Sequence, residues 1–366
     1  MNGRKTLFFL LTFCFLLSPL SVRAEDSPGS DKTKGLWETF SASLPDMVKD
    51  ALPAEPDGEK VKEALDFSHL CASIIAEIKG EENGLRGVIF QTLGVLLLFG
   101  TAEILGKSRK GVSMAVGLGC AFCMAELFFS VAEQTASFLT DLGKLAGGVS
   151  ALYTGVYAMG GLTASAGTAG VGFSGFISLL SVLGTGILVP FSQILFVLTP
   201  FTVWQAFPCL AEAVKQMKSL FVWTLTFIGV LFSASLAFQN SLSSSLDSLA
   251  MRTVKFSVGQ ALPTVGTAVS AAVGTLASSL SLVKNTAGGG ATLCFLLLFL
   301  PLLARLFLLR FLLAFGGGVF ASLGAETVGK TAEGYRRVLD FLLSASALFG
   351  GIFLILLLVC AGGIPA

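Results

Sequence analysis

The sequence predicts an all-α protein: a polytopic transmembrane helix bundle of about six to eight spanning helices, preceded by a small helical segment. Three observations lead there. Of the 366 residues, 54% are hydrophobic and 13% charged, whereas soluble domains have about 25% charged residues. Long apolar runs recur along the chain, several near the length that a bilayer requires. The charges are also clustered, since 14 of the 23 acidic residues lie between Glu25 and Glu82.

Residues 1–24 are typical of a secretory signal peptide. Two basic residues precede an apolar stretch, 6–17, that is too short to span a bilayer. Small residues at 22 and 24 then form a cleavage site. The alternative is an uncleaved first anchor. In both cases the segment that follows begins outside the cytoplasm.

Residues 25–84 form an acidic extracytoplasmic segment. Apolar residues recur there at helical spacing, and three prolines divide the pattern into short helices. A core this small rarely stands alone. The segment is therefore expected to lie on the membrane surface or on a partner, and residues 85–366 form the multi-pass membrane domain.

Six apolar runs are predicted to cross the membrane. Basic residues in the short turns set the orientation, because such residues stay in the cytoplasm. If the three basic clusters are cytoplasmic, the crossings alternate and both ends of the chain lie outside. The runs are 88–105, 112–131, 171–198, 220–238, 338–360 and one that begins at 291–304 and continues past Arg305 and Arg310. The topology-setting residues are Lys107, Arg109 and Lys110; Lys215 and Lys218; and Lys330, Arg336 and Arg337.

A tandem repeat is possible near 132–238 and 239–360, because short apolar motifs recur at a fixed offset. Chance similarity among apolar residues is the alternative.

Two further segments are unusual. Residues 147–170 are rich in glycine and alanine and predict an extra hairpin, a re-entrant element or, in the favoured interpretation, tightly packed helices. Residues 240–282 predict a helix that lies in the plane of the membrane interface.

No enzyme, cofactor or metal site is expected. His69, the single histidine, lies in the acidic segment, so the membrane domain lacks a His base and a multi-His metal site. Gly324–Thr331 matches the phosphate-binding pattern G-x-x-x-x-G-K-T, but that loop requires a preceding strand, and here an apolar run precedes it. The near-neutral net charge and the absence of a basic patch argue against nucleic-acid binding.

Two carboxylates stand within the apolar runs and are the candidate pathway or interhelical residues. Glu103 precedes Lys107 by one helical turn and is expected to form an ion pair with it at the cytoplasmic interface. Glu126 is expected to lie deeper. A carboxylate at that depth costs about 2.5–3.5 kcal/mol, so it should face protein or water, either on a transport pathway or in an interhelical hydrogen bond.

The stretch from Ser245 to Pro301 resembles the C-terminal half of the stage III sporulation protein AE family. The order of signal peptide, acidic segment and multi-pass body is similar as well. The residues that carry the resemblance include Asp247, Arg252, Lys255, Pro263, Gly266, Lys284, Asn285 and Pro301.

This resemblance implies a protein of the mother-cell membrane that surrounds the forespore. It implies partnership with the other proteins of the stage III A operon, including a separate ATPase, and with a channel protein of the forespore membrane. The expected role is a channel or export-gate subunit of an oligomeric complex, needed after engulfment. Two alternatives are a secondary transporter with a pathway near Glu126 and a passive membrane scaffold for ring-forming partners.

Overall fold

Helices make up nearly all of the described chain. The computed structural model describes residues 82–106, 110–203, 208–261 and 266–362, together with Glu38, Ser41 and Ala42. The predicted signal peptide and most of the acidic segment therefore lie outside the described residues. No strand occurs in the part that is described. The elements are α6 (Glu82–Leu105), α7 (Lys110–Met159), α8 (Thr163–Leu179), the π-helix η1 (Leu180–Leu188), α9 (Val189–Val203), α10 (Pro208–Ala261), α11 (Gly266–Ser322) and α12 (Glu326–Gly362).

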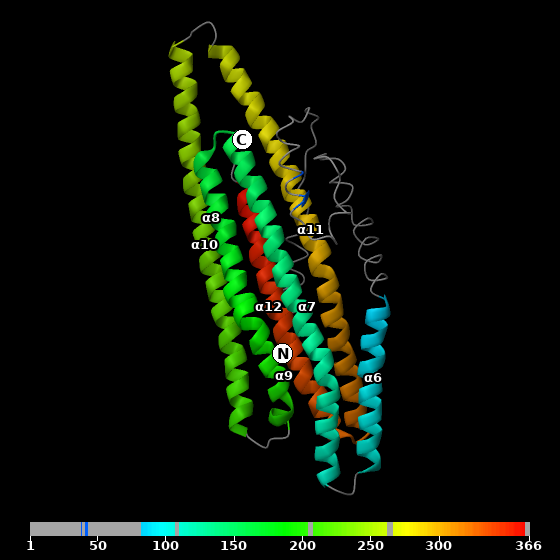
Figure 1. Ribbon diagram of the computed structural model, residues 1–366. Helices are drawn as coiled ribbons and strands as arrows, with labels where there is room; N and C mark the ends of the chain where they lie inside the picture. Colours follow the sequence, from blue (N-terminus) through cyan, green and yellow to red (C-terminus); the bar gives the residue numbers. More distant parts are fainter. Residues whose placement is uncertain are drawn as a thin grey trace.

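The helices lie side by side along one common direction and are joined at alternating ends of the bundle (Figure 1). Five of the candidate spans are single helices: α6, α7, α10, α11 and α12. The sixth is made of α8, η1 and α9 together. In the described ranges, six helices are long and apolar enough to cross a membrane. The predicted fold class, an all-α polytopic bundle, is confirmed.

The long helices α7, α10 and α11 extend beyond the apolar runs that predicted them. The run 112–131 is less than half of α7, which has 50 residues. The polar residues that follow the run do not break the helix, because Glu133 is exposed and Asp141 is partly exposed. Residues 147–170 form the apex of the α7–α8 hairpin. The expected interface-plane helix at 240–282 is wrong, because its described residues, 240–261 and 266–282, belong to α10 and α11 and run along the bundle (Figure 1).

The interior is filled by stacked aromatic rings. Phe128 of α7 lies between Phe196 of α9 and Tyr335 of α12, with ring centroids 4.6 and 4.3 Å apart. Phe295 of α11 contacts Phe353 of α12 at 5.5 Å. These side chains are fully buried, and aromatic pairs at such distances stabilise packing by about 0.5–1.5 kcal/mol beyond area burial. α12 is therefore a central helix of the bundle.

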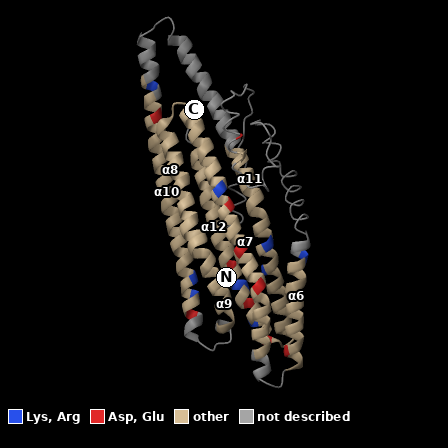
Figure 2. Cartoon of the chain, viewed as in Figure 1, with Lys and Arg blue, Asp and Glu red and all other residues tan. Residues whose placement is uncertain are grey.

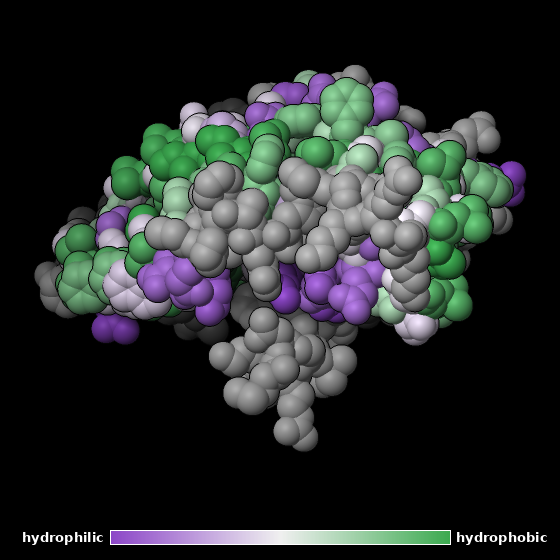
Figure 3. All heavy atoms as spheres, turned by 90° about the horizontal axis from the view of Figure 1, so that it is seen from below, coloured by the Kyte–Doolittle hydropathy of each residue, from purple (hydrophilic) through white to green (hydrophobic). Residues whose placement is uncertain are grey.

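The outer surface is mainly apolar. Charged residues are sparse along the helices and lie mostly in the middle and lower part of the view (Figure 2). Seen from below, green hydrophobic side chains occupy much of the visible rim, whereas purple hydrophilic ones gather in a few patches (Figure 3). Large exposed apolar residues such as Phe90, Trp223 and Phe311 are the surface that lipid or a partner subunit would cover.

The π-helix η1 has a local cause in the sequence. Pro190 lacks an N–H group, and in a regular α-helix its ring would clash with the carbonyl of Gly186, four residues earlier. In η1 the backbone bonds reach five residues back instead, as from the Val189 N–H to the Gly184 carbonyl. The span that contains α8 and α9 is thereby interrupted without being broken.

Candidate functional site

The turn between α11 and α12 is closed by a carboxylate from a distant helix. Gly324 ends α11 with a φ of 96°, a conformation that favours glycine. Glu103 of α6 is buried, and its two carboxylate oxygens accept hydrogen bonds from the backbone N–H groups of Thr327 (2.9 Å) and Val328 (3.0 Å). The first N–H groups of a helix have no partner within it. Glu103 therefore serves as the capping side chain of α12.

This arrangement explains the phosphate-loop pattern at Gly324–Thr331 as a helix hairpin. Part of the N–H donor set that would face a phosphate already binds the Glu103 carboxylate. Gly329 lies against α11, where an added Cβ would come within 2.8 Å of the Ala321 Cβ. Lys330 pairs with Glu326 at 3.2 Å. The two glycines thus serve the turn and close helix packing.

A second carboxylate caps α8 in the same way at the opposite end of the bundle. Asp247 of α10 is buried, and it accepts hydrogen bonds from the N–H groups of Ala164 (3.2 Å) and Ser165 (2.8 Å). Gly161, with a φ of 72°, forms the preceding turn. Asp247 belongs to the residues that carried the family resemblance, and the structure now shows what its carboxylate does.

The other residues of that resemblance are spread along α10 and α11 rather than gathered at one site. Arg252 is exposed on α10. Gly266 is the first residue of α11, and Pro301 lies within α11. Lys255, Lys284 and Asn285 belong to helices, but their side chains are outside the described set, as is all of Pro263.

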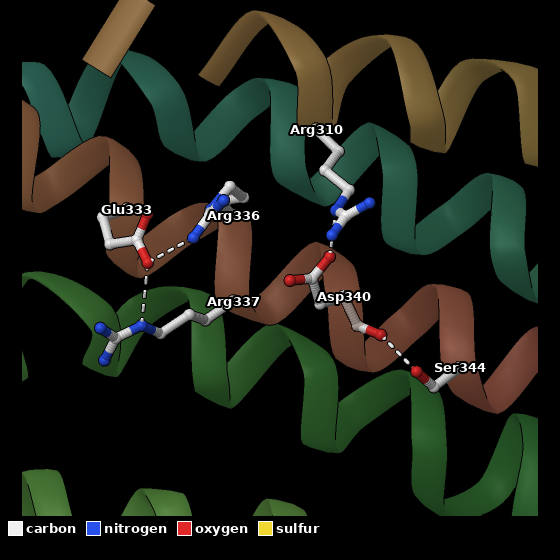
Figure 4. A network of polar contacts seen from close by, with 6 residues as sticks. All are labelled: Arg310, Glu333, Arg336, Arg337, Asp340 and Ser344. Carbon is white, nitrogen blue, oxygen red and sulfur yellow. Dashed lines mark hydrogen bonds and ion pairs between the residues drawn. The ribbon is translucent and has the colours of Figure 1, made fainter. Parts of the chain in front are cut away.

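Two of the topology-setting residues of α12, Arg336 and Arg337, lie near an ion pair between α11 and α12 (Figure 4). Arg310 of α11 forms an ion pair with Asp340 of α12. On α12, Glu333 accepts hydrogen bonds from Arg336 (2.6 Å) and Arg337 (3.3 Å).

Lys218 of α10 is near enough to be repelled by Arg337 and attracted by Asp340, so charged residues of three spans lie close together here. Lys107 and Arg109 lie outside the described residues, as does the side chain of Lys110. The expected Glu103–Lys107 ion pair and the membrane orientation stay predictions.

Glu126 lies on the outer face of α7 and is exposed. It lines a groove of about 820 Å³ between α6 and α7, together with Gln91, Ser130 and Glu133. Phe122 and Phe129 form part of its apolar wall. Glu103 is buried within the bundle, whereas Glu126 faces outwards. The expected depth of the two carboxylates along the membrane stays a prediction.

Sequence reasoning missed two features of these sites. Glu133 was overlooked because it falls beyond the apolar run, although it follows Glu126 by seven residues and so lies on the same helical face. The capping function of Glu103 was missed because its partners are more than 200 residues away. The sequence did contain a signal for such caps. The residues before α8 and α12, Leu162 and Ala325, have side chains that cannot cap a helix, so the first N–H groups of each helix need a partner from elsewhere in the chain.

The fold and these sites define a polytopic, all-α membrane bundle whose buried carboxylates join helices. The family model for stage III sporulation protein AE matches residues 67–363. The chain therefore belongs to this family of sporulation proteins. Neither the comparison with curated proteins nor that with solved structures gives a match.

Proposed function

We propose that the chain is a channel or export-gate subunit in the mother-cell membrane around the forespore, and that it has no enzymatic activity of its own. Its family membership supports a role in sporulation. The proposed partners are the other stage III A-operon proteins, including a separate ATPase, and a channel protein of the forespore membrane.

The groove between α6 and α7 is the observation that carries this proposal. Glu126 and Glu133 line it on a helix that is apolar enough to span a membrane. A carboxylate that faces hydrocarbon costs several kcal/mol, so it should meet protein or water instead. The bundle interior is filled by aromatic rings around Phe128 and Phe295. A conduit would therefore run along the groove, between this subunit and its neighbours.

The proposal is tested by comparing substitutions of the groove carboxylates in a sporulating strain. A variant with Glu126→Leu and Glu133→Leu keeps side chains of similar size along the groove but removes both carboxylates. If the groove is a hydrated conduit, spore yield should fall and forespores should shrink after engulfment, whereas the double Gln variant should keep partial function. Glu212→Gln is the control, because Glu212 is exposed on α10 away from the groove.

Two results would contradict this function. Deleting the gene should leave vegetative growth intact and block spores after engulfment, so a deletion strain with a normal spore yield rejects the role. Normal sporulation of the double Leu variant, with the protein present in membranes, would reject the conduit. It would favour the scaffold, in which the groove is covered permanently by a partner.

A further inference from the structure

The turns α7–α8 and α11–α12 have the same hydrogen bonds, 163 residues apart. Around Gly161, the Gly161 N–H bonds to the Ala158 carbonyl (3.1 Å) and the Leu162 N–H bonds to the Tyr157 carbonyl (2.9 Å). This pair defines a Schellman turn. Around the second turn, the Gly324 N–H bonds to the Ala321 carbonyl (3.2 Å) and the Ala325 N–H bonds to the Phe320 carbonyl (2.9 Å).

The sequences around both turns are also alike at this offset. Val156-Tyr157-Ala158 precedes the first glycine as Val319-Phe320-Ala321 precedes the second. The similarity continues into the helices that follow, where the matched alanines and leucines are buried in both. The matched identical pairs are Gly155 and Gly318, Val156 and Val319, Ala158 and Ala321, Gly161 and Gly324, Thr168 and Thr331, Ala169 and Ala332, Leu179 and Leu342, Leu180 and Leu343, and Ser181 and Ser344.

The two hairpins point in opposite directions. The α7–α8 turn is at the upper end of the bundle in Figure 1, and the α11–α12 turn is at the lower end. One helix precedes each hairpin, α6 in the first case and α10 in the second, and these two also run in opposite directions. Residues 82–203 and 208–362 therefore have the relation of an inverted-topology repeat.

The capping carboxylates have reciprocal roles in the two halves, although they do not lie at the offset of 163. Glu103 on the first helix of one half caps the hairpin of the other half, and Asp247 returns the contact at the opposite end. In each case the carboxylate accepts hydrogen bonds from the backbone N–H groups of the third and fourth residues after the turn glycine.

The middle of the bundle fits as well. A two-fold axis requires equivalent parts of α7 and α11 to meet halfway between the turns. Phe138 and Phe299, nearly equivalent at the offset of 163, contact each other there at 5.5 Å.

We propose that the chain consists of two inverted three-helix halves, and that the Glu103 and Asp247 contacts are latches that close the two ends of the bundle independently. This inference deepens the proposed conduit function, on which its gating part rests. The two latches share no residue, so breaking the hydrogen bonds at one end leaves those at the other end in place. This division differs from the predicted tandem repeat, whose borders near 132 and 239 fall within α7 and α10.

Cysteine labelling at the two ends tests the latches. The background is a full-length chain in which the seven native cysteines are replaced and which still supports sporulation. Reporter cysteines replace Val328 or Ser165, both of which are buried beside a latch. Labelling with N-ethylmaleimide in sheared membranes, where both faces are accessible, then compares Glu103→Gln and Asp247→Asn with the unchanged chain.

Glu103→Gln should raise the labelling rate at 328 roughly tenfold, equivalent to about 1.4 kcal/mol, and leave the rate at 165 unchanged. Asp247→Asn should do the reverse. Glu326→Gln, an exposed carboxylate on the same turn of α12, is the matched control and should change neither rate. The amount of protein in the membranes shows that each variant is inserted.

Three outcomes would overturn the inference. A variant that exposes both reporters shows that the ends are coupled, and a variant that exposes neither shows that the contact is no latch. Labelling as expected together with normal spore yield in both variants would reject the gating part. A failure of the proposed sporulation role is distinguishable, because it appears in the deletion strain and leaves the labelling pattern untouched.

Discussion

Gly317 should be a position where one added methyl group separates two central helices. In α11, a Cβ at this glycine would come within 2.8 Å of the Ala332 Cβ and 3.5 Å of the Gly329 carbonyl oxygen, both on α12. Both neighbours are stiff, since one is a methyl on the backbone and the other is the backbone itself. Gly317→Ala must therefore move the helices apart, and overpacking of this kind costs about 1–3 kcal/mol.

Gly318 supplies a matched control, because a Cβ there would meet nothing within 4 Å. Replacing glycine by alanine inside a helix is itself favourable by about 1 kcal/mol, and both variants share this gain. The difference between their free energies of unfolding therefore isolates the helix contact. We expect Gly317→Ala to be less stable than Gly318→Ala by about 1–3 kcal/mol.

The assay is unfolding of the purified protein in mixed micelles by increasing SDS, followed by circular dichroism. Equal midpoints for the two glycine variants would refute the reasoning. So would a stabilised Gly317→Ala, because the close approach of α11 and α12 would then not exist in the folded protein.

Three further predictions concern single contacts. In a double-mutant cycle of Arg310→Ala and Asp340→Ala, the coupling energy should be about 0.5–3 kcal/mol, and additive losses would show that the ion pair contributes nothing. Tyr157→Phe should lower the free energy of unfolding by about 0.5–1.5 kcal/mol, because the hydroxyl group donates to a carbonyl near the end of α12; an unchanged SDS midpoint would contradict it. Cysteines at Lys330 and Met159, both exposed, should be labelled from opposite sides of intact membranes, with Lys330 in the cytoplasm, and labelling of both from one side would reject the predicted orientation.

The sequence predicted the number of spans because lipid leaves an apolar chain few alternatives to a helix. The same rule could not find the ends of α7. The predicted apolar run ends at residue 131, shortly before Glu133, whereas the helix continues to Met159 because its backbone hydrogen bonds are still made. For the Gly-rich stretch 147–170, tightly packed helices were the favoured prediction and an extra hairpin was an alternative; the stretch forms the apex of the α7–α8 hairpin.

The candidate carboxylates were found from the sequence, but their environments were not. The expected depths came from the position of each carboxylate along its apolar run, and this position says nothing about which face of a helix a side chain occupies. Glu103 faces inward because α12 begins beside it, and Glu126 faces outward because α6 leaves a groove beside α7. Both facts depend on residues far apart in the sequence.

The length of α11 has a mechanical consequence. Its 57 residues rise 1.5 Å each and so measure about 85 Å, and even at a tilt of 40° the helix covers about 65 Å along the membrane normal. A bilayer with its headgroups is about 40–45 Å thick. A straight helix of this length therefore extends at least about 20 Å beyond the lipid. A force applied by a partner at its tip would be carried through continuous helix into the membrane, with no flexible loop to absorb it.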